Sequence, residues 1–486
     1  MMNQLHKISR SKFIVIILFL IINCFLLSNN TLAQPINNSQ RIQKVWESIE
    51  LDTNLILSGA EPQKRQELKT EKYARMSESV FDFFRATNSL FWQDFINDSR
   101  LGKFGNTKTK TWILGDCHIG NFGAYNNDKE EIIFDLNDFD ESIVADYQYD
   151  LWRLATSIIL VAEDNSLKNK SDQKEIIDNF SDSYLHSLKD YVGNDHETEI
   201  YFTQKNTYGE VENTIKKAAK DTREKMLNKW SKVVDNKRLF DIDNNEDLGI
   251  ANDAEKAIKS QIISYSDTLS SNVRYSQKYF TVKDVAQRLN AGLGSLGTPR
   301  YYLLIEGKTD DLDDDHILDI KRQYKPTAYG LFSLYDRLNY DSIFVNNAQR
   351  HAIAYKALIK HTDDFLGWMK LVDKNLTDGD FSGYYYVREI SHNKESLKTY
   401  KLEDKNSFIE VAKQLGEILA TDHARADQDF DEKLVPNSLE KQVKKITDGR
   451  GKEFRELVSD VALHYAEQVN IDYSSFVNRY NRYKEN

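Results

Sequence analysis

The chain has 486 residues, 40% of them hydrophobic and 12% aromatic, and its 65 Lys and Arg against 76 Asp and Glu give a formal charge of −11. This apolar content excludes disorder throughout, while 20 glycines and 5 prolines exclude collagen-like and proline-rich architectures. The acidic balance, without a stripe of Lys and Arg, argues against a nucleic-acid binder. At roughly 100 to 200 residues per domain, we expect two or three domains or lobes.

The N-terminal segment has the order of a secretory signal. Basic residues precede an apolar run at 13–27, and Thr31-Leu32-Ala33 offers a cleavage site. The run of about 15 residues is shorter than the roughly 20 that a spanning helix needs. An uncleaved anchor is the alternative, and it would be the only membrane contact. Removal of residues 1–33 predicts an exported protein, periplasmic or secreted, in which Cys117 has no cysteine partner for a disulfide.

The first half of the chain alternates between helical and strand-like patterns. Apolar residues recur at helical spacing across 40–100, which predicts helices. Short apolar runs at 111–114 and 131–134 flank a turn-rich stretch and predict two strands. Residues 147–235 return to long amphipathic helices. The second half is expected to form strands from Tyr279 to Tyr324 and mostly helices from about 340 onward.

A first group of functional candidates follows the first predicted strand, in the segment GDCHIGN. Asp116 at the strand end can take a proton from a hydroxyl, and the amide oxygen of Asn121 can hold a hard cation. His118 either supports this chemistry or forms a hydrogen bond within the loop. A plain loop-capping role is the alternative for the whole group.

A second group follows the next predicted strand and consists of closely spaced acids and one amide. Its members are Asp135, Asn137, Asp138, Asp140 and Glu141. So many oxygen ligands repel one another unless a cation or basic side chains lie nearby, which favours a magnesium ion shared with phosphate oxygens. Either group alone is a weak signal, but two strand-end clusters together predict an active site.

A third group lies far downstream, before one strand and on the next. Its members are Gly292, Gly294, Ser295, Gly297 and, on the second strand, Lys321. Such glycines let backbone amides approach a phosphate, and the lysine adds a point charge. Because strands rather than a helix follow, the pattern is closer to a kinase glycine loop than to a dinucleotide fingerprint. A plain hairpin turn is the alternative.

Segments across most of the mature chain resemble the bacterial domain-of-unknown-function family 2252, which is placed among kinase-like folds. The matching segments are MSESVFDFFRA, ILGDCHIGNFG, IFDLNDFDE, YDLWRLATS, LGSLG, DIK, DDFLGW, YYYVREI and TDHARAD. GDCHIGN is also similar to the catalytic loop of aminoglycoside and choline kinases. This resemblance implies Asp116 as base, Asn121 and Asp138 as magnesium ligands, and Asp150 as the brace of the catalytic loop.

The order of these segments departs from ordinary kinases. The glycines and Lys321 follow the catalytic loop instead of preceding it, and Val411–His423 resembles the helix that usually leads into that loop. A circular permutation explains both facts, since a packed core tolerates a changed connection when the chain ends lie close together. The alternative is that these glycines and His423 are merely structural.

The lysine-glutamate pair of kinases cannot be drawn, because no glutamate lies between Lys321 and Asp364. Glu389, or an aspartate such as Asp138, is the expected substitute. Arg85 and Arg425 are candidates to contact phosphate, and an internal ion pair or a packing role is the alternative for each.

The resemblance implies a two-lobed, circularly permuted kinase-like α+β fold, with ATP and Mg²⁺ as cofactors and phosphoryl transfer to an unknown hydroxyl acceptor. An exported enzyme meets little ATP, so a catalytically silent nucleotide- or phospholigand-binding module is one alternative. Another is a metal-dependent phosphoesterase built on Asp116, His118, Asp135 and Asp138. The expected divisions are a signal over 1–33, a helical and catalytic-loop part of the larger lobe over 34–245, a linker or helical connection over 246–278, a small β-rich nucleotide-binding lobe over 279–400, and the helical remainder over 401–486.

Overall fold

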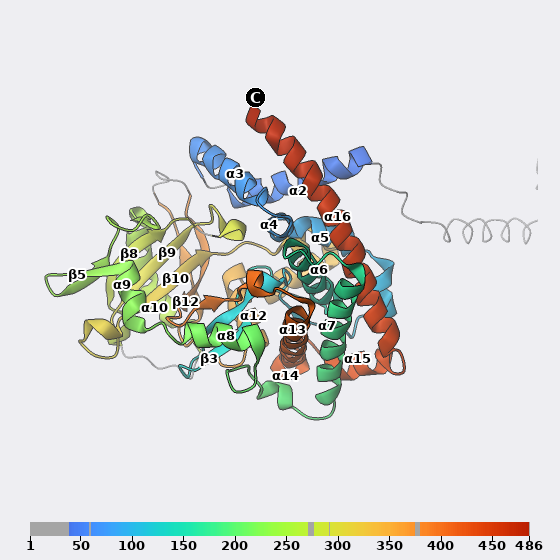
Figure 1. The fold of residues 1–486 in the computed structure, drawn as a ribbon. Coiled ribbons are helices and arrows are strands. Elements are labelled where there is room, and N and C mark those ends of the chain that lie inside the picture. Colours follow the sequence, from blue (N-terminus) through green and yellow to red (C-terminus); the bar gives the residue numbers. More distant parts are fainter. Residues whose placement is uncertain (1–37, 58–59, 271–276, 291, 375–379, 486) are drawn as a thin grey trace, which may run out of the picture.

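The structure is a computed structural model that describes residues 38–57, 60–270, 277–290, 292–374 and 380–485. The predicted signal segment and its cleavage site lie outside these residues. None of the described helices is both long enough and apolar enough to cross a membrane. The chain is an α+β protein, as predicted, with a helical body beside a body built on a sheet (Figure 1).

The smaller lobe is built on a six-stranded antiparallel sheet with the order β11-β12-β10-β9-β8-β7. Lys321 lies near the end of β10, opposite Arg300 of β9 and Tyr386 of β12. β9 and β10 follow from apolar runs bounded by polar turns. The strands are β7 Leu248–Ile250, β8 Val282–Arg288, β9 Arg300–Ile305, β10 His316–Arg322, β11 Gly367–Leu371 and β12 Gly383–Glu389.

Helices cover both faces of this sheet. Helix α10 (Asp253–Ser266) packs Ile258 and Tyr265 against one face. Helix α9 (Arg223–Trp230), followed by the hairpin of β5 (Ser231–Val234) and β6 (Lys237–Phe240), covers part of the other face. The segment 246–278, expected as a linker or helical connection, contains helix α10 and also supplies β7 to the sheet of the smaller lobe. The polar sequence hid this role because β7 is short and lies at the edge of the sheet.

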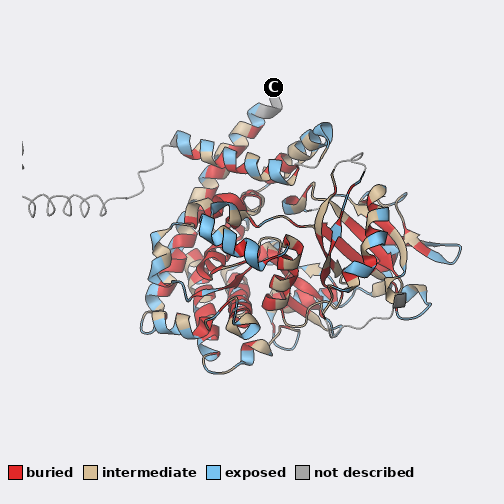
Figure 2. Cartoon of the chain, turned by 180° about the vertical axis from the view of Figure 1, so that it is seen from behind, coloured by how far each residue is buried: buried red, intermediate tan, exposed pale blue. Residues whose placement is uncertain are grey.

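The larger lobe is mostly helical and shares one continuous hydrophobic core. Figure 2 shows buried residues running through the interior of both bodies. Helix α12 packs against β11 and β12 as well as against α13, so it joins the two lobes. The helices of this core are α2 Asn38–Ile56, α3 Pro62–Met76, α4 Val80–Arg85, α5 Asn88–Phe95, α6 Gln148–Asp164, α7 Lys170–Asp190, α8 Gly209–Ala218, α11 Leu334–Ile343, α12 Asn347–Leu358, α13 Lys405–Arg425, α14 Gln428–Asp431, α15 Leu439–Thr447 and α16 Gly451–Glu485.

Short strands in the larger lobe carry the predicted acidic loops. The two predicted strands are confirmed as β1 (Lys110–Ile113) and β3 (Ile132–Leu136). β1 pairs with β4 (Ile143–Asp146), whereas β3 pairs with β2 (Phe122–Asn126), which also pairs with the two-residue β13 (Glu395–Ser396). The sequence did not predict β2, because its Gly and Asn are typical of turns and its pairing with β3 decides its conformation.

The first and last helices of the described chain pack against each other. Helix α2 packs along α16, and Arg41 forms ion pairs with Asp94 of α5 at 2.7 Å and Asp472 of α16 at 2.5 Å. The end of α13 lies against the beginning of β1, where Thr111 Oγ1 donates a hydrogen bond to the carbonyl oxygen of His423 at 2.8 Å. The last part of the chain thus completes a lobe that the first part begins.

Candidate functional site

Asp150 fixes the loop that follows β1. Its carboxylate accepts hydrogen bonds from the backbone amides of Leu114 at 2.6 Å and Gly115 at 2.9 Å, and His423 Nε2 lies 3.3 Å from it. Gly115 has φ +78°, and a Cβ there would lie 2.2 Å from the carbonyl oxygen of Glu141. Only glycine permits this close approach, so the first predicted loop lies directly against the second.

Asp116 lies in this loop with one carboxylate oxygen held by an arginine. Oδ1 accepts a hydrogen bond from Arg153 Nε at 2.5 Å, and the guanidinium of Arg153 lies 4.3 Å from the ring centre of Phe84. The Asp116 side chain is 21% exposed. Burial raises the pKa of Asp116, although Arg153 opposes this rise. The geometry leaves Oδ2 as the carboxylate oxygen that can receive a hydroxyl.

Asn121 and His118 complete the loop in different ways. Asn121 Nδ2 donates to the carbonyl oxygen of Asp116 at 3.0 Å, so Oδ1 is the atom that Asn121 can offer to a cation. His118 is buried and packs edge-on against Phe81, with ring centres 5.8 Å apart. Burial, together with Arg85 and Arg153, holds the pKa of His118 well below its usual value, so the imidazole is neutral.

Lys321 of the smaller lobe meets the second acidic loop of the larger lobe. Its Nζ forms an ion pair with the carboxylate of Asp140, and Gln323 Nε2 donates to Asp140 Oδ1 at 3.0 Å. Burial opposes ionisation of Asp140, yet Lys321 and His351 hold its pKa well below the usual range. Burial, followed by the charge of Asp140, raises the pKa of Asp138, although Lys321 opposes this.

The partner of Lys321 is therefore an aspartate, Asp140. Glu389, the other expected substitute, instead contacts Arg223 at 2.6 Å and His316 at 2.6 Å. Both interactions are on the smaller lobe, so Glu389 stabilises that lobe and does not orient Lys321.

Helix α12 lies where it fixes this acidic loop. The guanidinium of Arg350 donates to the carbonyl oxygens of Asp140 at 2.6 Å and Ser142 at 2.5 Å. The ring of His351 stacks on Tyr386 of β12, with centres 4.1 Å apart, and its Nδ1 lies 3.4 Å from Asp140 Oδ1. Sequence reasoning missed both residues, since neither forms part of a recognised motif.

Residues from both lobes line a cavity of about 390 Å³. The wall also contains Ser89 and Gln93 of α5 and the segment 322–327 that follows β10. Arg85 belongs to it and contacts Asp82 at 3.5 Å. The residues that the sequence singled out and the cavity brings together are Arg85, Asp116, Asn121, Asp138, Asp140, Glu141, Gly294, Ser295 and Lys321.

Only two of the four residues that the sequence singled out in the glycine turn line this cavity. Gly294 and Ser295 line the cavity, and a Cβ on Gly294 would meet nothing within 4 Å. Gly297 has φ +83°, and a Cβ there would lie 2.2 Å from Leu57 Cδ2 at the end of α2. Gly292 does not line the cavity. One side of the turn faces the cavity, while Gly297 serves packing against α2.

Asp135 and Arg425 lie outside the cavity. Asp135 is buried and shares a hydrogen bond with Asp422 of α13, and burial raises its pKa to about 6. Arg425 contacts Asp422 at 3.0 Å and donates to the carbonyl oxygens of Leu358 at 2.7 Å and Glu197 at 3.0 Å. Both residues hold α13 to neighbouring segments, which is the packing alternative for Arg425.

A second cavity, of about 620 Å³, borders the same face of the sheet. Arg300 and Asp319 form a two-bonded ion pair at 2.6 Å within its wall, and Arg388 and Lys394 also line it. Burial, together with Arg388 and Arg300, lowers the pKa of Lys394 to about 8. The sequence did not identify these cations, although the alternation along β12 places Arg388 on the same face as Tyr386 and thus Lys321.

Comparison with known proteins identifies the family but not the chemistry. Residues 64–479 match the family described as "Uncharacterized protein conserved in bacteria (DUF2252)". The chain belongs to this family. Neither the curated proteins nor the solved structures give a match. In this DUF2252 protein the strand-end acids and Lys321 lie inside the matched span, whereas the part of the cavity wall formed by α2 precedes it.

Proposed function

We propose that this DUF2252 protein is a circularly permuted, kinase-like phosphotransferase that moves a phosphoryl group from a magnesium-bound nucleotide to a hydroxyl acceptor. One observation carries the proposal: Lys321 of the smaller lobe lines the same cavity as Asp116 and Asp138 of the larger lobe. The ion pair between Lys321 and Asp140 joins residues 181 positions apart.

The arrangement of β8, β9 and β10 supports the kinase-like part of the proposal. They are neighbouring antiparallel strands, the turn between β8 and β9 carries Gly294 and Ser295, and β10 carries Lys321. Protein kinases likewise place a glycine-rich loop before a lysine on the third strand. The contacts of α13 with β1 and of α2 with α16 support the permutation. A circular permutation joins the original chain ends and opens a connection elsewhere, and both changes leave such a packed core intact.

The donor set fits a magnesium ion. Asp138 and Asn121 offer oxygen atoms toward one cavity, and Asp138 is a half-buried acid beside another acid, which a hard cation would stabilise. When bound, magnesium neutralises the charge of the phosphates. Asp116, held by Arg153 through Oδ1, orients the acceptor hydroxyl and takes its proton at Oδ2. Lys321 supplies positive charge to the phosphate groups.

The 620 Å³ cavity suits the nucleotide. Its volume lies within the range of roughly 300 to 1,000 Å³ for ligand sites. Arg388 and Lys394 line its wall beside the ion pair of Arg300 and Asp319, and acids such as Asp363 and Glu389 line it as well, so the wall carries charges of both signs. We therefore assign the base and ribose of the nucleotide to this cavity, and its phosphate groups to the 390 Å³ cavity, where Lys321 and Asp138 lie with Asp116 beside the acceptor.

A second candidate is a catalytically silent module that binds a nucleotide. It is favoured by the engagement of Lys321 with Asp140 in place of a glutamate, and by Arg153 on the carboxylate of Asp116. The proposed export of the protein favours it too, because ATP is scarce outside the cytoplasm. The phosphoesterase loses support, since Asp135 faces Asp422 instead of the cavity.

Two measurements on the purified protein separate these candidates. The first is the melting temperature with and without ATP and Mg²⁺, and the second is ADP formation with a panel of hydroxyl acceptors. The enzyme is expected to show both signals, and Asp116→Asn and Asp138→Asn should reduce ADP formation about 100-fold or more. Asp190→Asn, an exposed aspartate on α7, is the matched control and should leave the rate unchanged.

ATP stabilisation without turnover would select the silent module. If ATP and Mg²⁺ leave the melting temperature unchanged and no ADP is released, both candidates are contradicted. Turnover that persists in Asp116→Asn and Asp138→Asn would contradict the assigned site.

A further inference from the structure

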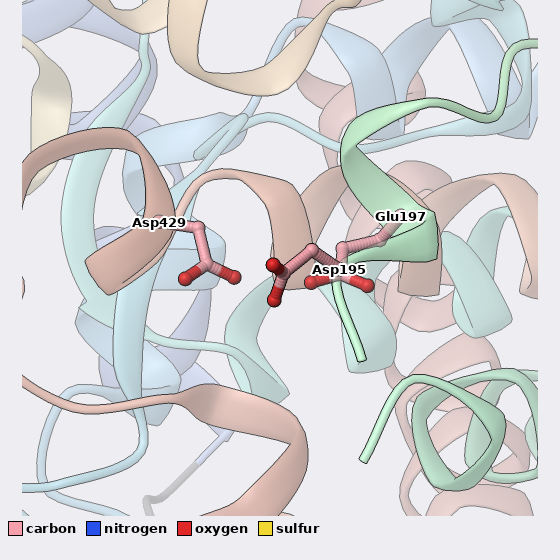
Figure 3. A group of neighbouring side chains, drawn as sticks. All are labelled: Asp195, Glu197 and Asp429. Carbon is pink, nitrogen blue, oxygen red and sulfur yellow. The ribbon is translucent and has the colours of Figure 1, made fainter. Parts of the chain in front are cut away.

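A second acidic region lies away from both cavities, between the segment after α7 and the helix α14. Asp195 and Glu197 come from the first segment and Asp429 from the second, and one ligand atom from each lies within 4.8 Å of the others. Figure 3 shows the three carboxylates turned toward one another. Asp195 and Asp429 are exposed, whereas Glu197 is buried.

Glu197 is the unusual member of this group. Its exposed fraction is 0%, and neither Oε1 nor Oε2 has a hydrogen-bond partner among the described residues. Burial, together with the charges of Glu440 and Asp429, raises its pKa to about 8. Burying an ionised carboxylate that accepts no hydrogen bond lowers the free energy of unfolding by roughly several kcal/mol, unless a proton or a cation neutralises the carboxylate.

The surroundings add negative charge instead of removing it. Asp427 and Glu440 are buried nearby, and Glu440 Oε2 also has no hydrogen-bond partner in the described part of the chain. No salt bridge joins any of these five acids to a basic side chain within the described ranges. Arg425, the closest candidate, donates to the backbone carbonyl of Glu197 and to Asp422.

We propose that Asp195, Glu197 and Asp429 bind a calcium ion that fastens the segment after α7 to α14. Three carboxylates provide only oxygen atoms, which are the ligands of hard cations, and they exclude the nitrogen and sulfur donors that zinc and copper prefer. Calcium suits them better than magnesium, because it accepts irregular sets of six to eight oxygens, including bidentate carboxylates. The exposure of Asp195 and Asp429 leaves room for water to complete the coordination.

This site is independent of the proposed phosphotransferase. It shares no residue with the wall of either cavity. The ion would add a link between α7 and the end of α13, beside the bonds that Arg425 already makes.

The test is a titration of the full-length, chelator-stripped protein with CaCl₂, followed by calorimetry and by the melting temperature. We expect one Ca²⁺ per chain and a rise in melting temperature of roughly 2 °C or more at about 1 mM Ca²⁺. Glu197→Gln should abolish both signals, and its melting temperature without calcium should not fall below that of the wild type, because a neutral amide replaces a buried carboxyl that needs a proton or a cation. Asp429→Asn, at an exposed position that cannot compromise folding in the same way, should also abolish binding.

Two controls locate the ion. Glu432→Gln removes an exposed acid one turn away and should bind Ca²⁺ as the wild type does. Asp138→Asn should keep the calcium response, which distinguishes this site from the proposed magnesium site. Absence of Ca²⁺ binding, unchanged binding in both Glu197→Gln and Asp429→Asn, or tighter binding of MgCl₂ than of CaCl₂ would each overturn the proposal. The first of these results would mean that a proton alone compensates Glu197.

Discussion

The protein contains two acidic regions in which the negative charge of the carboxylates is compensated in different ways. Around the 390 Å³ cavity, Asp116 faces Arg153 and Asp140 faces Lys321, so basic side chains of the chain itself compensate the acids. Around Glu197, no salt bridge within the described residues compensates the charge. Internal cations let the first region fold without a metal while keeping Asp138 available, whereas the second region depends on a proton or an external ion.

A third case lies between these two. Asp135 and Asp422 face each other with a single cation, Arg425, in contact with Asp422. Two acids and one guanidinium leave one negative charge uncompensated, and burial raises the pKa of both carboxyls. The number of basic side chains per acid therefore falls from the cavity, through the pair of Asp135 and Asp422, to the region around Glu197.

The largest effect is expected where an internal cation is removed. Lys321→Met leaves Asp140 without its ion-pair partner while preserving much of the side-chain volume. We expect the free energy of unfolding in urea to fall by about 3 kcal/mol, as when one partner of a buried pair is lost. Adding Asp140→Asn to this variant should restore more than half of the loss.

The matched control is Lys370→Met, the same change at an exposed position of the same sheet. It should alter the free energy of unfolding by less than about 0.5 kcal/mol. If Lys321→Met unfolds at the urea concentration of the control, the ion pair with Asp140 does not stabilise the cavity and the comparison fails.

The intermediate region predicts a pH dependence. Folding raises the pKa of Asp135 from 3.8 to about 6 and that of Asp422 well above 3.8. The folded protein thus binds more protons than the unfolded chain above pH 3.8, and stability falls as the pH rises through about 6 and beyond. Asp422→Asn should make the loss of stability between pH 5 and pH 8 smaller than in the wild type, measured by urea unfolding at both values.

An Asp422→Asn protein with the same pH dependence as the wild type would show that the pair does not hold a proton. Asp190→Asn, exposed on α7, serves as the reference because its charge lies in water.

The smallest effect is expected from a neighbour of Glu197. Glu440→Gln removes one buried charge and keeps an oxygen that can accept the hydrogen bond from Ser438 Oγ. In the presence of a chelator, the melting temperature should rise by about 1 to 2 °C, and Glu432→Gln should leave it unchanged. A lower melting temperature would mean that the charge of Glu440 is compensated and that the two acidic regions do not differ in this way.

Sequence patterns predicted the fold where apolar runs are strong. β1, β3, β9 and β10 follow from such runs, and the predicted glycine turn does lie between β8 and β9. The patterns failed where tertiary contacts decide the structure. β2 contains a glycine and an asparagine, both typical of turns, yet pairs with β3, and β7 is a short edge strand inside a polar stretch. Such elements depend on their partners and leave little local signal.

The candidate site was predicted in part for a similar reason. Acids after strands and a lysine on a strand are visible as local motifs, and the cavity does bring Asp116, Asp138 and Lys321 together. Arg153 gave no such signal, because it lies in the apolar run of α6, and Asp135 could not be separated from Asp138 by spacing alone. The pairing of each acid with its basic partner depends on contacts between residues that are distant in the sequence. Lys321 and Asp140 are 181 positions apart, and Arg153 and Asp116 are 37 positions apart.

The contact of β1 with the end of α13 can form only late in the synthesis of the chain. Thr111 and His423, which it joins, are 312 residues apart. At roughly 5 to 20 residues per second, the ribosome needs about 15 to 60 seconds to make the intervening segment. The six strands of the smaller lobe emerge within that interval and can pair first. The loop after β1 lacks this support until then, so a fragment truncated before His423 should hold an ordered sheet beside an incompletely folded larger lobe.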